Sequence, residues 1–180
     1  MAMRQPHTAL RYTTLVITVP VLLLSAWWLL VYDNYHVVAA GQFYRSGQMT
    51  ASQFRRHADR DGFLTVINLR PETNEVWHAR EMEECIKRGI NLIDCPMQGD
   101  TSPTLKQMGD LVALMKKSSR PILIHCQHGA DRTGLAVALY LLAIGNQTEE
   151  DAHKALSLRY GHLPIIKKSF DHAFEEFSRN

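Results

Sequence analysis

Short apolar runs alternate with longer amphipathic stretches along most of the chain. Runs typical of buried strands cover residues 63–69, 90–95 and 122–124, and residues 43–48 form a further candidate strand and turn. Helical patterns cover residues 50–59, 75–88, 104–115, 135–143, 148–160 and 165–177. Strands that alternate with helices predict an α/β domain with a central, mainly parallel sheet flanked by helices.

Capping signals delimit several of these helices. Thr104 with Gln107 matches a capping box, and residues 148–151 begin the next helix in the same way. Thr50 or Ser52 is placed to cap the helix at 50–59. Gly89 directly follows a charged amphipathic stretch and is expected to end that helix.

Residues 13–32 form an uncharged apolar run that differs from the alternating pattern of the rest of the chain. It is about long enough to cross a bilayer as a helix, and Trp27, Trp28 and Tyr32 near one end suit an interfacial belt. We therefore expect a polar tail over residues 1–12, a transmembrane anchor over 13–32 and a folded domain over 35–180.

Two other interpretations of this run are a buried core helix and a cleaved signal peptide. Val-Val-Ala-Ala at 37–40 resembles a cleavage site. The apolar run is longer than a usual signal core, however, and cleavage there would fall close to the start of the domain, which favours the uncleaved anchor. Arg4 and Arg11 precede the span, so the positive-inside rule favours a cytoplasmic N-terminus and an exported domain.

Composition restricts the other functional classes. The chain of 180 residues has a net charge of +2 and no basic stripe with interleaved aromatics, which gives no support to nucleic-acid binding. Its three cysteines are a small and odd number, which does not suit a disulfide framework. Cys85 and Cys95 are expected in the core, and an alternative is that Cys95 pairs reversibly with Cys126 under oxidation.

The stretch from Pro121 to Gly134 contains the candidate chemistry. A predicted strand ends at His125, a polar loop follows, and a predicted buried helix begins after Gly134. Backbone N–H groups of such a loop and the positive end of the helix dipole can together hold an anion. Gly129 permits a tight turn in the loop, and Gly134 permits close packing of the helix.

Cys126 stands at the mouth of this loop. Helix N-termini and nearby cations favour the thiolate form of a cysteine, which makes Cys126 a candidate nucleophile. Arg132 would hold two oxygens of a tetrahedral dianion, and Thr133 could donate its hydroxyl to the sulfur. His125 could brace the loop by hydrogen bonds. These groups suit attack on a phosphate monoester with neither a metal nor another cofactor.

The run His125-Cys126-x5-Arg132-Thr133-Gly134 resembles the signature of the cysteine-dependent protein tyrosine and dual-specificity phosphatases. Two further stretches, Tyr44-Arg-Ser-Gly-Gln48 and Asn68-Leu-Arg-Pro-Glu72, are similar to bacterial and plant-fungal atypical members. The resemblance covers roughly residues 35–177 and implies their fold. Arg45 and Arg70 in these stretches suit a structural charge as well as a functional one, and Arg70 is a candidate substrate contact.

The resemblance also implies roles for individual residues. An aspartate on a loop before the signature strand protonates the leaving oxygen in this superfamily, and Asp100 matches in kind and place. Asp94 is a weaker candidate because it falls within a predicted strand. The substrate phosphate is expected to contact the loop residues Gln127, His128, Gly129, Ala130 and Asp131.

Asp131 departs from many family members, which have a small residue before the arginine. An Asp-Arg-Thr ending also occurs in myotubularin and Sac-type phosphoinositide phosphatases, where this acid can be assigned a protonation role. We favour a helix-capping role, with the side chain turned away from Cys126. His128 could contact a second anionic group or lie in solvent.

The most favoured substrate is a phosphoprotein, and the alternative is a phosphoinositide or other phospholipid, which a membrane anchor would bring near. A catalytically inactive phospho-binding module and a sulfurtransferase are less favoured. A zinc site from His125, Cys126 and His128 is also disfavoured, because adjacent strand residues face opposite sides.

Overall fold

The computed structural model describes residues 16–23 and 33–180. The chain divides into two compact units, Met1–Tyr32 and Asp33–Asn180. In the first unit, residues 16–23 form a short helix with exposed apolar side chains. Within 16–23 and 33–180, no helix is both long enough and apolar enough to cross a membrane. The remainder of the anchor predicted over 13–32 lies outside the described residues.

The second unit is built on a five-stranded sheet with strand order β1-β2-β5-β3-β4. The strands are β1 (His36–Ala39), β2 (Phe43–Ser46), β3 (Thr65–Asn68), β4 (Asn91–Asp94) and β5 (Ile122–His125). β1 pairs antiparallel with β2, and the other three pairings are parallel. The predicted mainly parallel α/β fold is confirmed.

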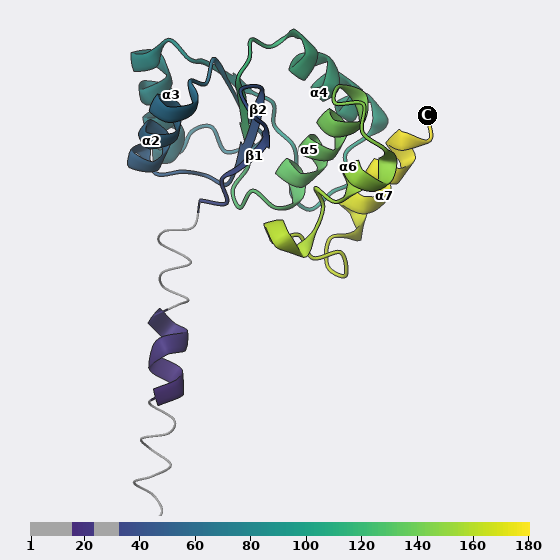
Figure 1. The fold of residues 1–180 in the computed structure, drawn as a ribbon, viewed down its shortest axis with the longest axis horizontal. Coiled ribbons are helices and arrows are strands. Elements are labelled where there is room, and N and C mark those ends of the chain that lie inside the picture. The colour runs from purple at the N-terminus through teal and green to yellow at the C-terminus, as the bar shows by residue number, and fades with distance from the viewer. Residues whose placement is uncertain (1–15, 24–32) are drawn as a thin grey trace, which may run out of the picture. The chain divides into compact units, whose positions relative to one another are not determined.

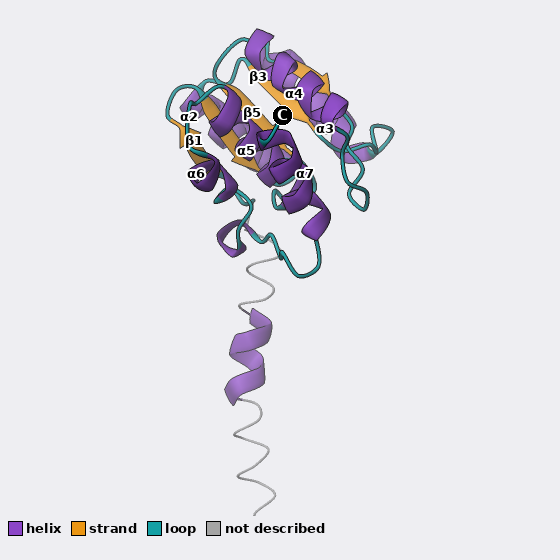
Figure 2. Cartoon of the chain, turned by 90° about the vertical axis from the view of Figure 1, so that its right-hand side faces the viewer, coloured by secondary structure: helices purple, strands orange, loops and turns teal. Residues whose placement is uncertain are grey.

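Helices cover both faces of this sheet (Figure 1). Their bounds are α2 (Ala51–Asp61), α3 (Val76–Arg88), α4 (Leu105–Lys117), α5 (Asp131–Ala143), α6 (Glu149–His153), η1 (Leu158–Tyr160) and α7 (Lys168–Ser178). α2 and α3 lie on one face, and α4 to α7 lie on the other, where Figure 2 shows α4, α5 and α7 in front of the strands.

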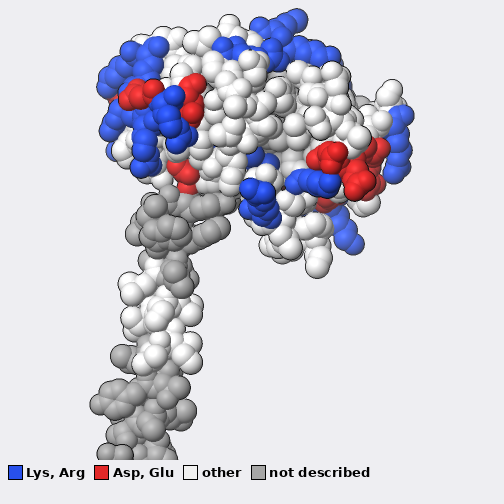
Figure 3. Space-filling model, viewed as in Figure 1, with Lys and Arg blue, Asp and Glu red and all other residues white. Residues whose placement is uncertain are grey.

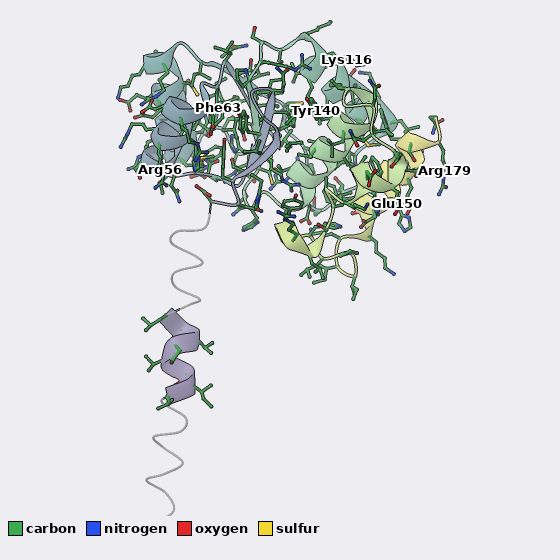
Figure 4. The ribbon with its side chains drawn as sticks, in the orientation of Figure 1. Arg56, Phe63, Lys116, Tyr140, Glu150 and Arg179 are labelled. Carbon is green, nitrogen blue, oxygen red and sulfur yellow. The ribbon has the colours of Figure 1, made fainter. Side chains whose placement is uncertain are left out.

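Strand pleating explains the two hydrophobic cores. Successive strand side chains point to opposite faces of a sheet. Ile122 and Ile124 of β5 accordingly pack in the core beneath α4 to α7, whereas Leu123 packs in the core beneath α2 and α3. Figure 4 shows Phe63 and Tyr140 on these opposite sides of the sheet. β5 is thus buried on both faces, as its unbroken apolar sequence predicts.

The predicted helix limits are confirmed where a local cap sets them. Thr50 and Thr104 each accept a bond from the backbone N–H three residues later, within complete capping boxes. Gly89 ends α3 with a left-handed φ of 65°. These limits depend on hydrogen bonds between residues close in sequence, which is why pattern reasoning finds them.

Four elements differ from the sequence-based expectation. α5 begins at Asp131 and not after Gly134, so Arg132, Thr133 and Gly134 belong to its first turn. β1 was not predicted. The helix predicted over 148–160 is wrong beyond His153, because α6 ends there; the carbonyl of Ala155, which a longer helix would use, instead accepts a hydrogen bond from Arg45 Nη1 at 3.0 Å. The last helix begins at Lys168 and not at 165, because the N–H groups of residues 166 and 167 both bond to the Leu163 carbonyl in a turn.

Acidic and basic side chains lie side by side over α2 and α3, and again over α6 and α7 (Figure 3). Glu84 of α3 illustrates the first group, since it pairs with Arg55 at 3.0 Å and with Arg88 at 2.6 Å. This mixed pattern on the face shown agrees with the small net charge of the chain.

Candidate active site

The site lies where the central parallel strands end. In the sheet register, His125 at the end of β5 is level with Ser46 of β2 and Asn68 of β3. The segments that follow these three strands therefore meet at one edge, the usual place for a site in a parallel sheet. Cys126 is the first residue after β5 and is only 2% exposed.

The loop at 126–130 is held from outside through its carbonyl groups. Three successive carbonyl oxygens accept hydrogen bonds from Gln48 N to Gln127 (3.0 Å), from Asn34 Nδ2 to His128 (2.8 Å) and from Arg45 Nη2 to Gly129 (2.8 Å). In contrast, no N–H group of residues 127–132 donates to another residue of the described chain. Carbonyls bonded outward leave the N–H groups free to bind an anion.

Gly129 is required by the shape of this loop. Its φ is +71°, and a Cβ there would lie 2.6 Å from the Gly47 nitrogen and 2.7 Å from the Ser46 carbonyl carbon. Backbone atoms cannot yield at such distances without moving the loop. The sequence-based expectation of a glycine-dependent turn is confirmed.

α5 starts directly after the loop and directs its N-terminus toward it. Its N-cap is Ala130, which makes no side-chain capping bond, so the first N–H groups of the helix remain available. A Cβ on Gly134 would lie 2.9 Å from Leu156 Cδ2, which confirms that this glycine permits close packing.

Arg132 projects from the first turn of α5 and is held by the loop after β4. Its Nη1 donates to the Met97 carbonyl at 3.3 Å, and the residue is 9% exposed. On the same loop, the Gly99 carbonyl accepts a 2.7 Å hydrogen bond from Lys167 Nζ. Two cations from α5 and the start of α7 thus hold the loop that carries Asp100.

Thr133 and His125 are both buried beside the loop. The Thr133 hydroxyl has no hydrogen-bond partner in residues 16–23 and 33–180. An unpaired buried hydroxyl costs roughly 1–3 kcal/mol, so this group is available for the sulfur or a bound anion. Bracing of the loop by His125 stays a prediction, since neither ring nitrogen makes a well-aligned hydrogen bond within the described chain. Its Nε2 lies 3.2 Å from Glu81 Oε2.

A pocket of about 260 Å³ opens above the loop. It is lined by Gly99, Cys126, Gln127, His128, Asp131, Arg132 and Lys167. The structure thus brings together most of the loop residues that the sequence predicts. Gly99 and Lys167 were missed, because no local pattern links them to a loop that is 27 to 41 residues away in the sequence.

Five predicted site residues lie outside this lining, namely Gly129, Ala130 and Thr133 of the loop and helix start, and the more distant Asp100 and Arg70. Asp100 is exposed on the loop next to Gly99. Arg70 lies against α3, with its guanidinium 3.8 Å from the centre of the Trp77 ring and its Nε 3.2 Å from Glu72 Oε2. Asp94, the weaker acid candidate, accepts hydrogen bonds from Asn68 at 2.8 Å and faces His78 at 3.0 Å.

Asp131 is not the N-cap of α5, which is Ala130, but the first residue of the helix, where an acidic side chain suits the helix dipole. Its Oδ1 lies 2.7 Å from Nδ1 of His162, a fully buried residue. This contact is tertiary, since the segment between η1 and α7 brings an imidazole to the carboxylate. Sequence reasoning assigned no function to His162.

All three cysteines are free thiols. Burial raises the pKa of the Cys85 thiol to about 12 and also raises the pKa of the Cys95 thiol. Neither is therefore suited to act as a nucleophile near neutral pH. In the described residues, no three His, Cys, Asp or Glu side chains are grouped as metal ligands.

The family model for a DSP-PTPase phosphatase fused to NAD+ kinase matches residues 30–172. The chain belongs to this family. It is a cysteine-dependent phosphatase of the tyrosine and dual-specificity type, and the family assignment inferred from the signature at 125–134 is confirmed.

Solved structures share the fold of this phosphatase. The core catalytic domain of the PP-IP phosphatase SIW14 from S. cerevisiae is 20% identical, with a TM-score of 0.68 over 81% of this chain and 86% of that one. P. aeruginosa TpbA in complex with pTyr is 18% identical, with a TM-score of 0.57 over 82% and 92%. PTPMT1 in complex with PI(5)P is 18% identical, with a TM-score of 0.61 over 82% and 98%.

Proposed function

We propose that this phosphatase hydrolyses phosphate monoesters through a phosphocysteine on Cys126. Arg132 and the loop N–H groups hold the phosphoryl oxygens, Thr133 donates its hydroxyl to the sulfur, and Asp100 is the general acid and base. The observation that carries the proposal is the orientation of the loop, whose carbonyls bond outward around a buried cysteine while its N–H groups make no bond to the described chain.

The reaction has two steps. In the first, Cys126 Sγ attacks phosphorus, the S–P bond forms, the ester P–O bond breaks and the leaving oxygen takes a proton from Asp100. In the second, water attacks phosphorus and gives a proton to Asp100 while the S–P bond breaks. Orthophosphate leaves and the thiolate is restored. Preorganised donors around the phosphoryl oxygens stabilise both transition states.

Acid quenching with a ³²P-labelled substrate tests the intermediate. The wild-type chain should hold label on the protein and release phosphate with EDTA present. Cys126→Ser should neither hold label nor release phosphate. The matched Cys95→Ser variant should hold label and release phosphate like the wild-type chain. Label retained by folded Cys126→Ser would assign the nucleophile to another residue. Binding without turnover in the wild-type chain would instead support an inactive phospho-binding module.

We favour a phosphoprotein substrate, and the alternative is a phosphoinositide. TpbA bound to pTyr and PTPMT1 bound to PI(5)P share this fold and illustrate the two classes. The cations Arg132 and Lys167 beside the pocket suit an anion of either class. Phosphate release from phosphotyrosine peptide, phosphoserine peptide and short-chain phosphoinositide, compared as kcat/KM, tests the choice. A preference for the lipid would replace the protein assignment.

We also propose that residues 13–32 anchor the domain on the exported side of a membrane, supported by the uncharged apolar sequence of that run. The full chain should resist extraction from membranes by alkaline carbonate. Leu22→Arg should be extracted more readily, since an arginine at the centre of a span costs about 2.5–3.5 kcal/mol. Protease added to the outside of spheroplasts should cleave the domain, and protection of the domain would reverse the orientation.

A further inference from the structure

A chain of ionisable groups extends from the pocket into the protein. Asp131 Oδ1 lies 2.7 Å from His162 Nδ1, and His162 Nε2 lies 3.0 Å from Asp171 Oδ2. The other oxygen of Asp171 lies 3.1 Å from His153 Nε2. The four residues come from α5, the segment before α7, α7 and α6. His162 at the centre is 0% exposed.

The geometry favours a charged imidazole. A neutral histidine has one N–H donor, whereas both ring nitrogens of His162 face carboxylate oxygens, and only the imidazolium can donate to both. Burial is the largest single influence and lowers the pKa of His162, but hydrogen bonds and charges from Asp131 and Asp171 together raise it above its ordinary value. The element before His162 is η1, and the nearby cations Arg45 and Arg159 lie over the ring of its Tyr160.

The position of Asp131 would by itself disfavour the reaction. Asp131 lines the same pocket as Cys126, where a thiolate and a phosphate dianion must both be accommodated. Like charges in a partly buried site repel strongly because the local dielectric is low. Arg132 and Lys167 attract the phosphate, but a third cation is needed to offset this carboxylate, and His162 is the group bonded to it.

We propose that His162 is a positioning residue that holds the Asp131 carboxylate at the pocket wall and neutralises its charge, so that the pocket can accept a phosphate dianion. Asp171 acts through His162 by keeping the imidazole charged and correctly oriented. The inference rests on the proposed function, because it concerns the phosphate subsite of the same pocket.

The sign of the pH effect follows from the raised pKa. Below the pKa of His162, the imidazolium fully compensates the charge of Asp131. This compensation is lost as pH rises through that pKa, because neutral His162 leaves one carboxylate without a donor. Phosphate binding should therefore weaken on the alkaline side. Asp171→Asn removes one stabilising carboxylate, which should move this weakening to lower pH.

A double-mutant comparison tests the charge argument. His162→Gln should raise KM for 4-nitrophenyl phosphate, and Kd for inorganic phosphate, on the order of tenfold. Asp131→Asn/His162→Gln should bring both back to within about threefold of Asp131→Asn alone, because the uncompensated charge is gone. A double variant as weak as His162→Gln, or an unchanged His162→Gln, would overturn the proposal. Thermal unfolding of each variant separates binding loss from loss of fold.

His153→Gln is the matched control. His153 bonds to the other oxygen of Asp171 and does not line the pocket, so its loss should change KM and phosphate Kd by less than about twofold. The calorimetric phosphate titration needs no turnover. Hence a wild-type chain without phosphatase activity would contradict the proposed function, whereas loss of the His162–Asp131 coupling would contradict only this inference.

Discussion

Arg45 Nη2 donates a 2.8 Å hydrogen bond to the Gly129 carbonyl, and Nη1 of the same guanidinium donates at 3.0 Å to the Ala155 carbonyl. The side chain is 1% exposed and lies 3.9 Å from the centre of the Tyr160 ring. It therefore joins the loop at 126–130 to the segment that follows α6. Of the two roles that the sequence leaves open for Arg45, the structure supports the structural one.

Arg45→Met should destabilise the fold and reduce activity together. The substitution leaves two buried carbonyls without donors, which we expect to cost about 2–5 kcal/mol in free energy of unfolding. Urea denaturation and kcat/KM measure the two effects. Arg56→Met on exposed α2 is the control, with less than about 0.5 kcal/mol expected. A stable but inactive Arg45→Met would point to a direct role in substrate binding.

Gly129→Ala should inactivate the enzyme far more than a glycine substitution at an equally left-handed position elsewhere. The new Cβ would collide with backbone of Gly47 and Ser46, and displacement of the loop by about 1 Å can cost roughly a hundredfold in rate. Gly41→Ala is the matched control, because its φ is +69° with no atom within 4 Å of the added Cβ. Equal activity in both variants would show that the loop tolerates the shift.

Asp100→Asn tests the general acid that the pocket lining does not include. If Asp100 protonates the leaving oxygen, kcat should fall about 10²–10⁴-fold for an alkyl phosphate and much less for 4-nitrophenyl phosphate, whose leaving group needs no proton. Asp110→Asn, exposed on α4, should change neither rate. The same small change with both substrates would mean that Asp100 is not the acid, and Asp131 would be tested next.

Lys167→Met should weaken substrate binding. It removes a cation from the pocket and a 2.7 Å bond to the Gly99 carbonyl, and we expect KM to rise roughly three- to tenfold. The neighbouring Lys168→Met, at an exposed position outside the lining, should leave KM unchanged. A rise in KM that disappears at high salt in both variants would indicate general charge and no specific contact.

Sequence reasoning was most successful where neighbouring residues decide the structure. The cap at Thr50, the capping box at Thr104, the Gly89 terminus and the buried run of β5 all depend on contacts within a few residues. The loop at 126–130 belongs to this class as well, since strand, glycine turn and helix start are continuous from 122 to 134. Local chemistry therefore indicated both the α/β fold and the position of the candidate nucleophile.

Only the tertiary structure decided what surrounds that loop. Three hydrogen-bonded pairs illustrate this: Asp131–His162, Lys167–Gly99 and Arg45–Gly129. The two residues of each pair are between 31 and 84 positions apart in the sequence. The helix predicted over 148–160 stops at the end of α6 for the same reason, since the Ala155 carbonyl bonds to Arg45 and not to a later N–H group of a helix. A periodic pattern records which face of an element is buried. It does not record which distant charge will meet a buried carbonyl or carboxylate, because that depends on how complete elements pack against one another.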